Sequence, residues 1–330
     1  MPSEASNSRP AISSPESTSC EVCGHSSGHR THVATERMFG RGGEFLYREC
    51  AGCGCLQLVN VPPNLGEFYP EDYYSLTETT AVRHPWWNLQ LRRQRAWHEL
   101  TGKSLLGRLL PRGAEVPLHY RWMRRLGLTP HHRILDVGCG TGWLLHLLYS
   151  EGFTSVLGID PYVDRDLEFP NGVRVLKREL PELDGSFDLV MLNHSFEHMA
   201  QPERVLRDLR RLVAPGRSAL IRIPVADSWA WRHYGVQWVQ LDAPRHLFLH
   251  TRRSIELLAA RTGFEVEYVE CDSTEFQFTG SEAYLRGMTL HEMLAADPFT
   301  AEVHQSFRQR AEELNAQAQG DQAAFYLRAI

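Results

Sequence analysis

The residues best suited to chemistry stand in one short run, Asp136-Val137-Gly138-Cys139-Gly140-Thr141-Gly142. Its three glycines occupy alternate positions after a short apolar segment that ends in Asp136. Glycine permits tight turns and lets a ligand approach the backbone closely, and the amide groups at a helix start point outward. The run therefore predicts a ligand-binding loop between a strand near 133–137 and a helix near 142–151.

A second acid follows at a spacing that suits a nucleoside. Asp160, with Pro161 after it, ends the next apolar segment and lies 18 residues after Gly142. An acid at the end of a second strand suits ribose hydroxyls. Dinucleotide folds use G-x-G-x-x-G, whereas the spacing here is D-x-G-x-G-x-G and no P-loop lysine follows. The alternative interpretation is an ordinary strand–turn–helix that happens to contain glycines.

The run resembles motif I of the class I S-adenosylmethionine-dependent methyltransferases. The resemblance implies that the glycine loop packs against the methionine and ribose parts of the cofactor, and that Asp160 holds the ribose. An acid and an apolar neighbour after the third strand hold the adenine in that family, and Glu179 and Leu180 match them by position. The implied cofactor-binding residues are Asp136, Gly138, Cys139, Gly140, Gly142, Asp160, Pro161, Glu179, Leu180 and Asn193.

The segment after the fourth expected strand, 187–193, contains two histidines and an acid. It reads Asn193-His194-Ser195-Phe196-Glu197-His198, with Pro202 behind, and resembles the family's FDxVxxxxxxEHxxxP stretch. Ligands of an α/β sheet bind at the carboxyl ends of its strands. The resemblance implies that polar residues here lie beside the transferred methyl group. His194 is then a candidate base or substrate ligand, and Glu197-His198 is expected to fix the loop.

A second candidate site is Asp242-Ala243-Pro244-Arg245-His246. Imidazole titrates near neutral pH, so His246 can take a proton as a methyl group arrives. The segment resembles the DxPRH stretch of a bacterial methyltransferase subfamily that includes sugar C-methyltransferases. We favour His246 as the catalytic or substrate-binding residue, with Arg245 and Asp242 orienting it and His194 in reserve. The alternative is that Arg245 pairs with Asp242 while His246 caps a helix starting near Thr251.

Four cysteines near the N-terminus form two C-x-x-C pairs, Cys20 with Cys23 and Cys50 with Cys53. Each pair can point two thiolates at one tetrahedral zinc ion. Four protein ligands leave no open position, so the Zn2+ is expected to be structural. The segment between the pairs, 31–47, is expected to form one or two hairpins. The alternatives are two disulfides, which a reduced compartment disfavours, or metal-free thiols.

The elements that must position these groups define an α/β fold. Strands alternate with helices from residue 131 onward, which implies parallel pairing in a Rossmann-like, seven-stranded methyltransferase sheet with helices on both faces. Strands at 264–269 and 274–279 are expected to form its edge. The expected divisions are a disordered tail at 1–19, a zinc-ribbon module at 20–80, a helical linker at 81–130, the core at 131–280 and a helical C-terminal extension at 281–330.

Two flanking segments keep alternative interpretations. Residues 86–127 are expected to be helical, with a break at Pro111-Arg112-Gly113 and a shorter helix at 118–126. Arg92, Arg93 and Arg95 lie in the first part, either against an anionic substrate or on a solvated face. The tyrosine-rich segment 69–74 either packs the ribbon onto the core or lines a substrate entrance. The extension at 281–330 is a candidate contact for a homodimer.

The bulk composition narrows the function. The 330 residues are 42% hydrophobic and carry a net charge of −5, which argues against nucleic-acid binding as the main activity. No apolar run reaches membrane-spanning length and no secretion segment opens the chain, so we expect a cytoplasmic enzyme. The prediction is methyl transfer from S-adenosylmethionine to a small molecule such as a sugar, sugar nucleotide or natural-product intermediate. The alternatives are an RNA or protein methyltransferase that docks substrate on the ribbon, and a non-catalytic cofactor-binding scaffold.

Overall fold

The computed structural model describes residues 19–69, 85–110 and 117–330. Most of the predicted tail at 1–19, the tyrosines after Tyr69 in the segment 69–74, and the expected helix break at 111–113 lie outside these residues.

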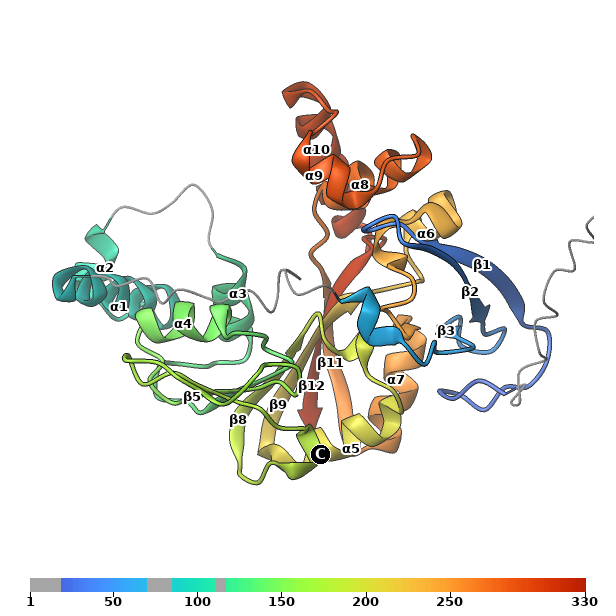
Figure 1. Cartoon of the computed structure of the whole chain (residues 1–330). Helices are drawn as coiled ribbons and strands as arrows, with labels where there is room; N and C mark the ends of the chain where they lie inside the picture. The colour runs from blue at the N-terminus through green and yellow to red at the C-terminus, as the bar shows by residue number, and fades with distance from the viewer. Residues whose placement is uncertain (1–18, 70–84, 111–116) are drawn as a thin grey trace, which may run out of the picture.

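A mixed eight-stranded sheet forms the centre of the protein, in the order β11-β12-β9-β8-β4-β5-β7-β6 (Figure 1). Strands β4, β5, β7, β8 and β9 pair in parallel, whereas β12 is antiparallel to both β9 and β11. The strands are β4 (Ile134–Val137), β5 (Val156–Ile159), β6 (Leu167–Glu168), β7 (Arg174–Leu176), β8 (Phe187–Asn193), β9 (Val213–Pro224), β11 (Phe264–Cys271) and β12 (Gln322–Ala329). The predicted Rossmann-like methyltransferase fold is confirmed, with the two-residue β6 added at one edge.

Helices cover both faces of the sheet, so the middle of its central strand β8 is a continuous apolar run, Leu189-Val190-Met191-Leu192. In β8, Leu189 and Met191 point to the face of the sheet that α3 (Leu118–Arg125) and α4 (Trp143–Ser150) cover. Val190 and Leu192 point to the other face, in the core that includes α5 (Pro202–Leu212) and α7 (Arg252–Arg261). By this alternation the last residue, Asn193, faces the side of α3 and α4.

The helical region predicted at 86–127, with a break at 111–113, has a further division in the structure. Helix α1 (Trp86–Thr101) ends at Gly102, which has a left-handed backbone, with φ of 71°. Ser104 then caps α2 (Leu105–Leu109) by accepting a hydrogen bond from the Gly107 amide. Helices α1, α3 and α4 lie together on one side of the sheet (Figure 1).

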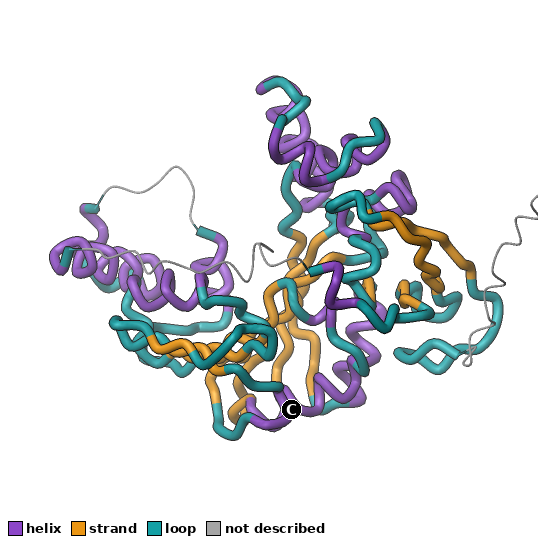
Figure 2. The backbone as a smooth tube through the Cα atoms, in the orientation of Figure 1, coloured by secondary structure: helices purple, strands orange, loops and turns teal. Residues whose placement is uncertain are grey.

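The N-terminal module is joined to the core by a second, smaller sheet, of order β1-β2-β3-β10. Strands β1 (Arg30–Glu36) and β2 (Gly42–Glu49) form the predicted hairpin, and β3 (Leu56–Leu58) follows. The fourth strand, β10 (Phe248–Leu249), comes from the core segment after His246 and pairs with β3. Figure 2 shows this group of strands apart from the large sheet.

The prediction for the C-terminal region is wrong at two places. Residues 274–279 are not a strand, because α8 (Phe276–Leu285) begins there. Helices α9 (Leu290–Ala295) and α10 (Ala301–Ala316) follow, as the expected helical composition indicates. The chain then returns as β12 into the slot between β9 and β11, so the sheet extends well beyond residue 280. The remaining helix, α6 (Trp229–Tyr234), precedes the segment that carries Asp242 and His246.

Within the described ranges, none of the helices is both long enough and apolar enough to cross a lipid bilayer.

Candidate active site

The glycine loop between β4 and α4 requires its glycines for backbone and steric reasons. Gly138, Gly140 and Gly142 have φ of 71°, 54° and 85°, in the left-handed region that other residues avoid. A Cβ on Gly138 would lie 2.5 Å from the Cβ of Ser195, and one on Gly142 would lie 2.9 Å from Val175 Cγ2. The loop is thus a tightly packed turn with its backbone at the carboxyl edge of the sheet.

Asp160 fixes this loop from the end of β5. Its Oδ2 accepts a hydrogen bond of 2.8 Å from the Gly140 amide, and its Oδ1 accepts one of 2.9 Å from the Tyr162 amide. Each carboxylate oxygen has two lone pairs, so both oxygens can still accept a further donor such as a ribose hydroxyl. Asp160 is therefore both a support of the loop and a candidate ligand of the cofactor.

Asp136 lies buried at the end of β4. Burial is the main reason that the pKa of Asp136 is raised to about 7, and the charge of Asp160 adds to the effect. A cation bound beside this pair of acids would reverse the shift, because an opposite charge favours the ionised form. The site is therefore electrostatically suited to a positively charged ligand.

The other predicted cofactor residues lie in the loops after β4, β5, β7 and β8. The side chain of Cys139 packs against Gly158 of β5, where an added Cβ would lie 2.4 Å from the Cys139 Sγ. Pro161 is exposed beside Asp160. Glu179 is exposed and its amide donates to the Glu182 carboxylate at 2.9 Å, while Leu180 is buried in the core. The contacts of these residues with a cofactor stay predictions.

His194 and Asn193 share one arginine at the end of β8. Arg222 of β9 donates to His194 Nε2 at 2.6 Å and to Asn193 Oδ1 at 3.1 Å, and pairs with Asp272 at 2.7 Å. The Nε2 lone pair of His194 is therefore already occupied. The sequence analysis did not identify Arg222, although a single arginine within the apolar run 219–223 was the available signal.

Arg245 and Asp242 form the ion pair that the sequence analysis left open as an alternative. Arg245 is fully buried, donates to Asp242 and Phe68 O, and also pairs with Glu36 of β1 at 2.9 Å. Burial opposes these charges, yet the pairing raises the pKa of Arg245 and lowers that of Asp242. Arg245 thus ties the N-terminal module to the core.

His246 does not cap the next helix, because Thr251 caps α7 with its own hydroxyl. The His246 ring is buried, and its Nδ1 lies 2.8 Å from Gln240 O. Since that carbonyl can only accept, Nδ1 carries the proton and Nε2 keeps a free lone pair. The Nε2 atom lies 3.9 Å from Glu197 Oε1 and 3.9 Å from Asp242 Oδ2. His246 is therefore the histidine of the two with an available basic nitrogen.

Glu197 is a fully buried carboxylate among three histidines. Neither of its oxygens has a hydrogen-bond partner within the described ranges, and His194 Nδ1 lies 3.5 Å away. Burial alone would raise the pKa of Glu197, but His194, His198 and His246 lower it to about 2. The pKa of His198 is lowered, mainly by burial. Ligand atoms of Glu197, His198 and His246 lie within 4.8 Å of one another, so this cluster could also hold a cation.

Tyr69 supports the packing interpretation of the tyrosine-rich segment. Its hydroxyl lies 3.1 Å from His198 Nδ1 and 3.4 Å from Arg245 O. Burial raises the pKa of Tyr69 above its usual range, so the phenol is a poor base. The residue joins the N-terminal module to the loops that carry the histidines.

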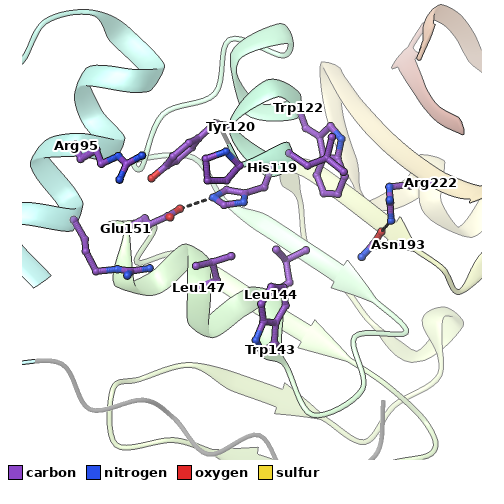
Figure 3. Close-up of a pocket in the computed structure, with 13 residues that line it drawn as sticks. Arg95, His119, Tyr120, Trp122, Trp143, Leu144, Leu147, Glu151, Asn193 and Arg222 are labelled. Carbon is purple, nitrogen blue, oxygen red and sulfur yellow. Dashed lines mark hydrogen bonds and ion pairs between the residues drawn. The ribbon is translucent and has the colours of Figure 1, made fainter. Parts of the chain in front are cut away.

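A cavity of about 470 Å³ opens beside Asn193 and runs along α4 (Figure 3). Asn193 and Arg222 border one end, near Trp143 at the start of α4. Leu144 and Leu147 of α4 and Trp122 of α3 form an apolar wall. The other end is polar and contains His119, Tyr120, Glu151, Arg92 and Arg95.

The four paired cysteines gather in one cluster. The Sγ atoms of Cys20 and Cys53 lie 3.8 Å apart, those of Cys23 and Cys50 lie 3.4 Å apart, and all four lie within 4.8 Å of one another. Thiolates held about 2.3 Å from a tetrahedral zinc ion would be separated by about 3.8 Å. All four cysteines are free thiols, so the disulfide alternative is wrong.

Three features together define a class I methyltransferase. They are the parallel sheet in which β12, one position in from the edge, is antiparallel, the glycine loop, and the acid after β5. The chain belongs to the methyltransferase domain family, whose profile matches residues 92–269, more than half of its length. It is therefore an S-adenosylmethionine-dependent methyltransferase, as predicted.

Curated relatives match part of the chain. A ubiquinone biosynthesis O-methyltransferase of Bordetella avium is 32% identical over 169 residues, which cover 46% of this chain and 68% of that protein. One of Pseudomonas aeruginosa (strain LESB58) is 29% identical over 157 residues, which cover 44% of this chain and 60% of that protein.

Among solved structures, the [4+2]-cyclase SpnF matches with a TM-score of 0.42 and 20% identity, over 63% of this chain and 77% of that one. A methyltransferase from Mesorhizobium loti matches with a TM-score of 0.37 and 19% identity, over 66% of this chain and 100% of that one.

The residues of the site fit S-adenosylmethionine. The glycine loop has left-handed backbone at Gly138, Gly140 and Gly142, and Asp136 and Asp160 are buried acids beside it. The cofactor's ammonium and sulfonium charges and its ribose hydroxyls are suited to these acids. When bound, the cofactor supplies an electrophilic methyl group.

Proposed function

We propose that this protein methylates a small molecule, and that the acceptor atom is a hydroxyl oxygen of a sugar, sugar nucleotide or natural-product intermediate. The observation that carries the proposal is the cavity of about 470 Å³ that opens beside Asn193, at the edge of the sheet where the glycine loop lies. A cavity of this size suits a small molecule. The names of the curated relatives, which are small-molecule O-methyltransferases, support the same class of acceptor.

Each group has a part in this proposal. The glycine loop, Asp136 and Asp160 hold the methionine and ribose parts of the cofactor, and Glu179 and Leu180 border its adenine. Asn193 separates the cofactor from the acceptor cavity. His246 takes the proton that a hydroxyl acceptor loses, because its Nε2 lone pair is free and two carboxylates flank it.

The cofactor assignment is tested by Asp160→Asn. The substitution keeps an acceptor for the loop amide but removes the charge that a ribose hydroxyl would meet. Calorimetry should show that S-adenosylhomocysteine binding weakens by ~1–3 kcal/mol, the scale of a hydrogen bond to a charged group. Asp164→Asn, a change at an exposed neighbour, should bind like wild type. Equal affinity in all three proteins would show that Asp160 does not hold the ribose.

We further propose that the cysteine cluster binds one structural zinc ion. Elemental analysis should find about one zinc per chain, and a Cys20→Ser/Cys50→Ser variant should lose it together with the fold of β1 to β3, because metal binding and folding are coupled. Protease resistance of the N-terminal module reports on that fold. A metal-free preparation with a folded module would contradict the proposal. If the wild type contains a second zinc ion per chain and the variant retains that one, the second ion is placed at Glu197, His198 and His246.

A further inference from the structure

The far end of the cavity carries more positive than negative charge, because Arg92 and Arg95 share it with a single carboxylate, that of Glu151. Arg92 and Arg95 line this end, and within the described ranges neither forms an ion pair with a carboxylate. The Nε of Arg95 is buried without a hydrogen-bond partner, whereas the Nε of Arg92 donates to Ser150 Oγ at 3.1 Å. Arg92 and Arg95 are only half-buried, but burying the Arg95 Nε without a partner has a cost that an anion bound here would relieve.

The other charged groups of the cavity already have partners. Glu151 accepts a bond of 2.7 Å from His119 Nε2, and both side chains are buried (Figure 3). Arg222, at the opposite end, pairs with Asp272. Among the described residues, Arg92 and Arg95 are thus the charged side chains of the cavity that have no ion-pair partner.

The positions along α4 separate this basic end from the glycine loop. Trp143 and Glu151 both line the cavity, and the eight positions from one to the other correspond to about 12 Å of helix. The wall between them is apolar, formed by Leu144 and Leu147 of α4 and Trp122 of α3. A ligand that fills the cavity thus meets a polar edge at Asn193, an apolar middle and two arginines at the far end.

We propose that the methyl acceptor is an amphipathic anion, with its reactive hydroxyl near Asn193 and a carboxylate or phosphate held by Arg92 and Arg95. The planar guanidinium group suits both oxyanions, because it offers paired donors. The cofactor's own carboxylate does not account for this end of the cavity, since the cofactor is held at the glycine loop, at the other end of α4. This inference rests on the proposed small-molecule methyl transfer.

The test measures binding of defined probes to the full-length protein saturated with S-adenosylhomocysteine. The probes are 4-(4-hydroxyphenyl)butanoate, its uncharged primary amide, and 3-(4-hydroxyphenyl)propyl phosphate. In wild type at least one anionic probe should bind ~10-fold or more tightly than the amide, the scale of charge-assisted hydrogen bonds. The better of the two anions identifies the oxyanion. Failure of both anions to outbind the amide would overturn the proposal.

Matched variants locate the effect. Arg92→Gln and Arg95→Gln should each abolish most of the preference for the anion, and the double variant should bind anion and amide alike. Arg93→Gln is the control on the same helix, because Arg93 lies over the Tyr149 ring and does not line the cavity. Retention of the preference in the double variant would overturn the inference.

S-adenosylhomocysteine affinity, measured on the same variants, separates the two proposals. Unchanged cofactor affinity in Arg92→Gln and Arg95→Gln is expected, and a loss would show that the arginines bind the cofactor instead. A wild-type protein that binds no S-adenosylhomocysteine would contradict the proposed function, whereas the probe preference can still be measured without cofactor.

Discussion

His194 and His246 differ in whether the Nε2 lone pair is available: in His194 it accepts a hydrogen bond, and in His246 it is free. Arg222 donates to Nε2 of His194, so protonation of that nitrogen would cost the bond and bring a cation against a guanidinium. The Nδ1 of His246 is held by Gln240 O, and its Nε2 faces Glu197 and Asp242. An imidazole nitrogen with a free lone pair can accept a proton, whereas one that already accepts a hydrogen bond is less available. The preference for His246 as the base thus has a physical reason beyond its sequence context.

This preference predicts different effects of two substitutions. His246→Ala should lower turnover by roughly 10²–10⁴, the usual contribution of a general base, while S-adenosylhomocysteine affinity stays close to wild type. Single-turnover assays with an anionic hydroxyl acceptor, run beside calorimetry, measure both quantities. His194→Ala is the comparison, and it should lower turnover less. Wild-type turnover in His246→Ala would remove the histidine-base mechanism, and a larger loss in His194→Ala would transfer the role to that residue.

Local sequence patterns predict the glycine loop and its acid, whose contacts with a cofactor stay predictions. The glycine residue type itself permits the left-handed backbones at Gly138, Gly140 and Gly142, and Asp160 contacts the loop from the end of the neighbouring strand. The partners of the histidines could not be predicted in this way. Arg222 reaches His194 only through the pairing of β8 with β9, and such a contact has no signature in either segment alone.

The loop before β10 joins the two sheets of the protein. Arg245 of this loop pairs with Glu36 at the end of β1, and the strand that follows the loop, β10, pairs with β3. Glu36 also accepts hydrogen bonds from the amides of Phe39 and Arg41. This one acid therefore organises the turn after β1 and fastens the N-terminal module to the loop that carries His246.

Glu36→Gln should destabilise the whole protein, because it removes the negative charge that faces a buried guanidinium and replaces one acceptor oxygen by an NH2 donor. The expected loss is about 3 kcal/mol, at the lower end of the range for a broken buried ion pair, since Asp242 still pairs with Arg245. Denaturant unfolding followed by tryptophan fluorescence measures it. Glu44→Gln, at an exposed position of β2, should change the stability by less than ~0.5 kcal/mol. Similar stabilities of the two variants would mean that the pair contributes little.

The division of the chain into a ribbon and a core was predicted from cysteine spacing and from the glycine loop, and both signals are local. The strand that joins the two parts is only two residues long, and its partner lies about 190 residues away in the sequence. A strand as short as Phe248–Leu249 has no detectable periodicity. The close attachment of the ribbon to the catalytic loops therefore became visible only in the structure.

At the scale of the whole molecule, the large sheet is completed by the last strand of the chain. The sequence around β12 is rich in alanine and glutamine, which favour helices, and the expected helical extension followed that propensity. The structure places Gln322–Ala329 between two strands instead, where nearly every side chain is buried. Tertiary packing outweighs local propensity in such a position, because both neighbours supply hydrogen bonds and both faces are covered.

The position of β12 predicts that the stability of the methyltransferase core depends on residues near the end of the chain. Phe325 is fully buried and contributes to the hydrophobic core on the side of α5 and α7. Phe325→Ala should lower the free energy of unfolding by ~3–5 kcal/mol, through lost burial and the cavity that remains. Arg328→Ala is the control on the same strand, because its pair with Glu267 is exposed and should contribute little to stability. Chemical denaturation measures both. If β12 were only a peripheral tail, Phe325→Ala would unfold at the wild-type denaturant concentration, and the sheet order that defines the fold would need revision.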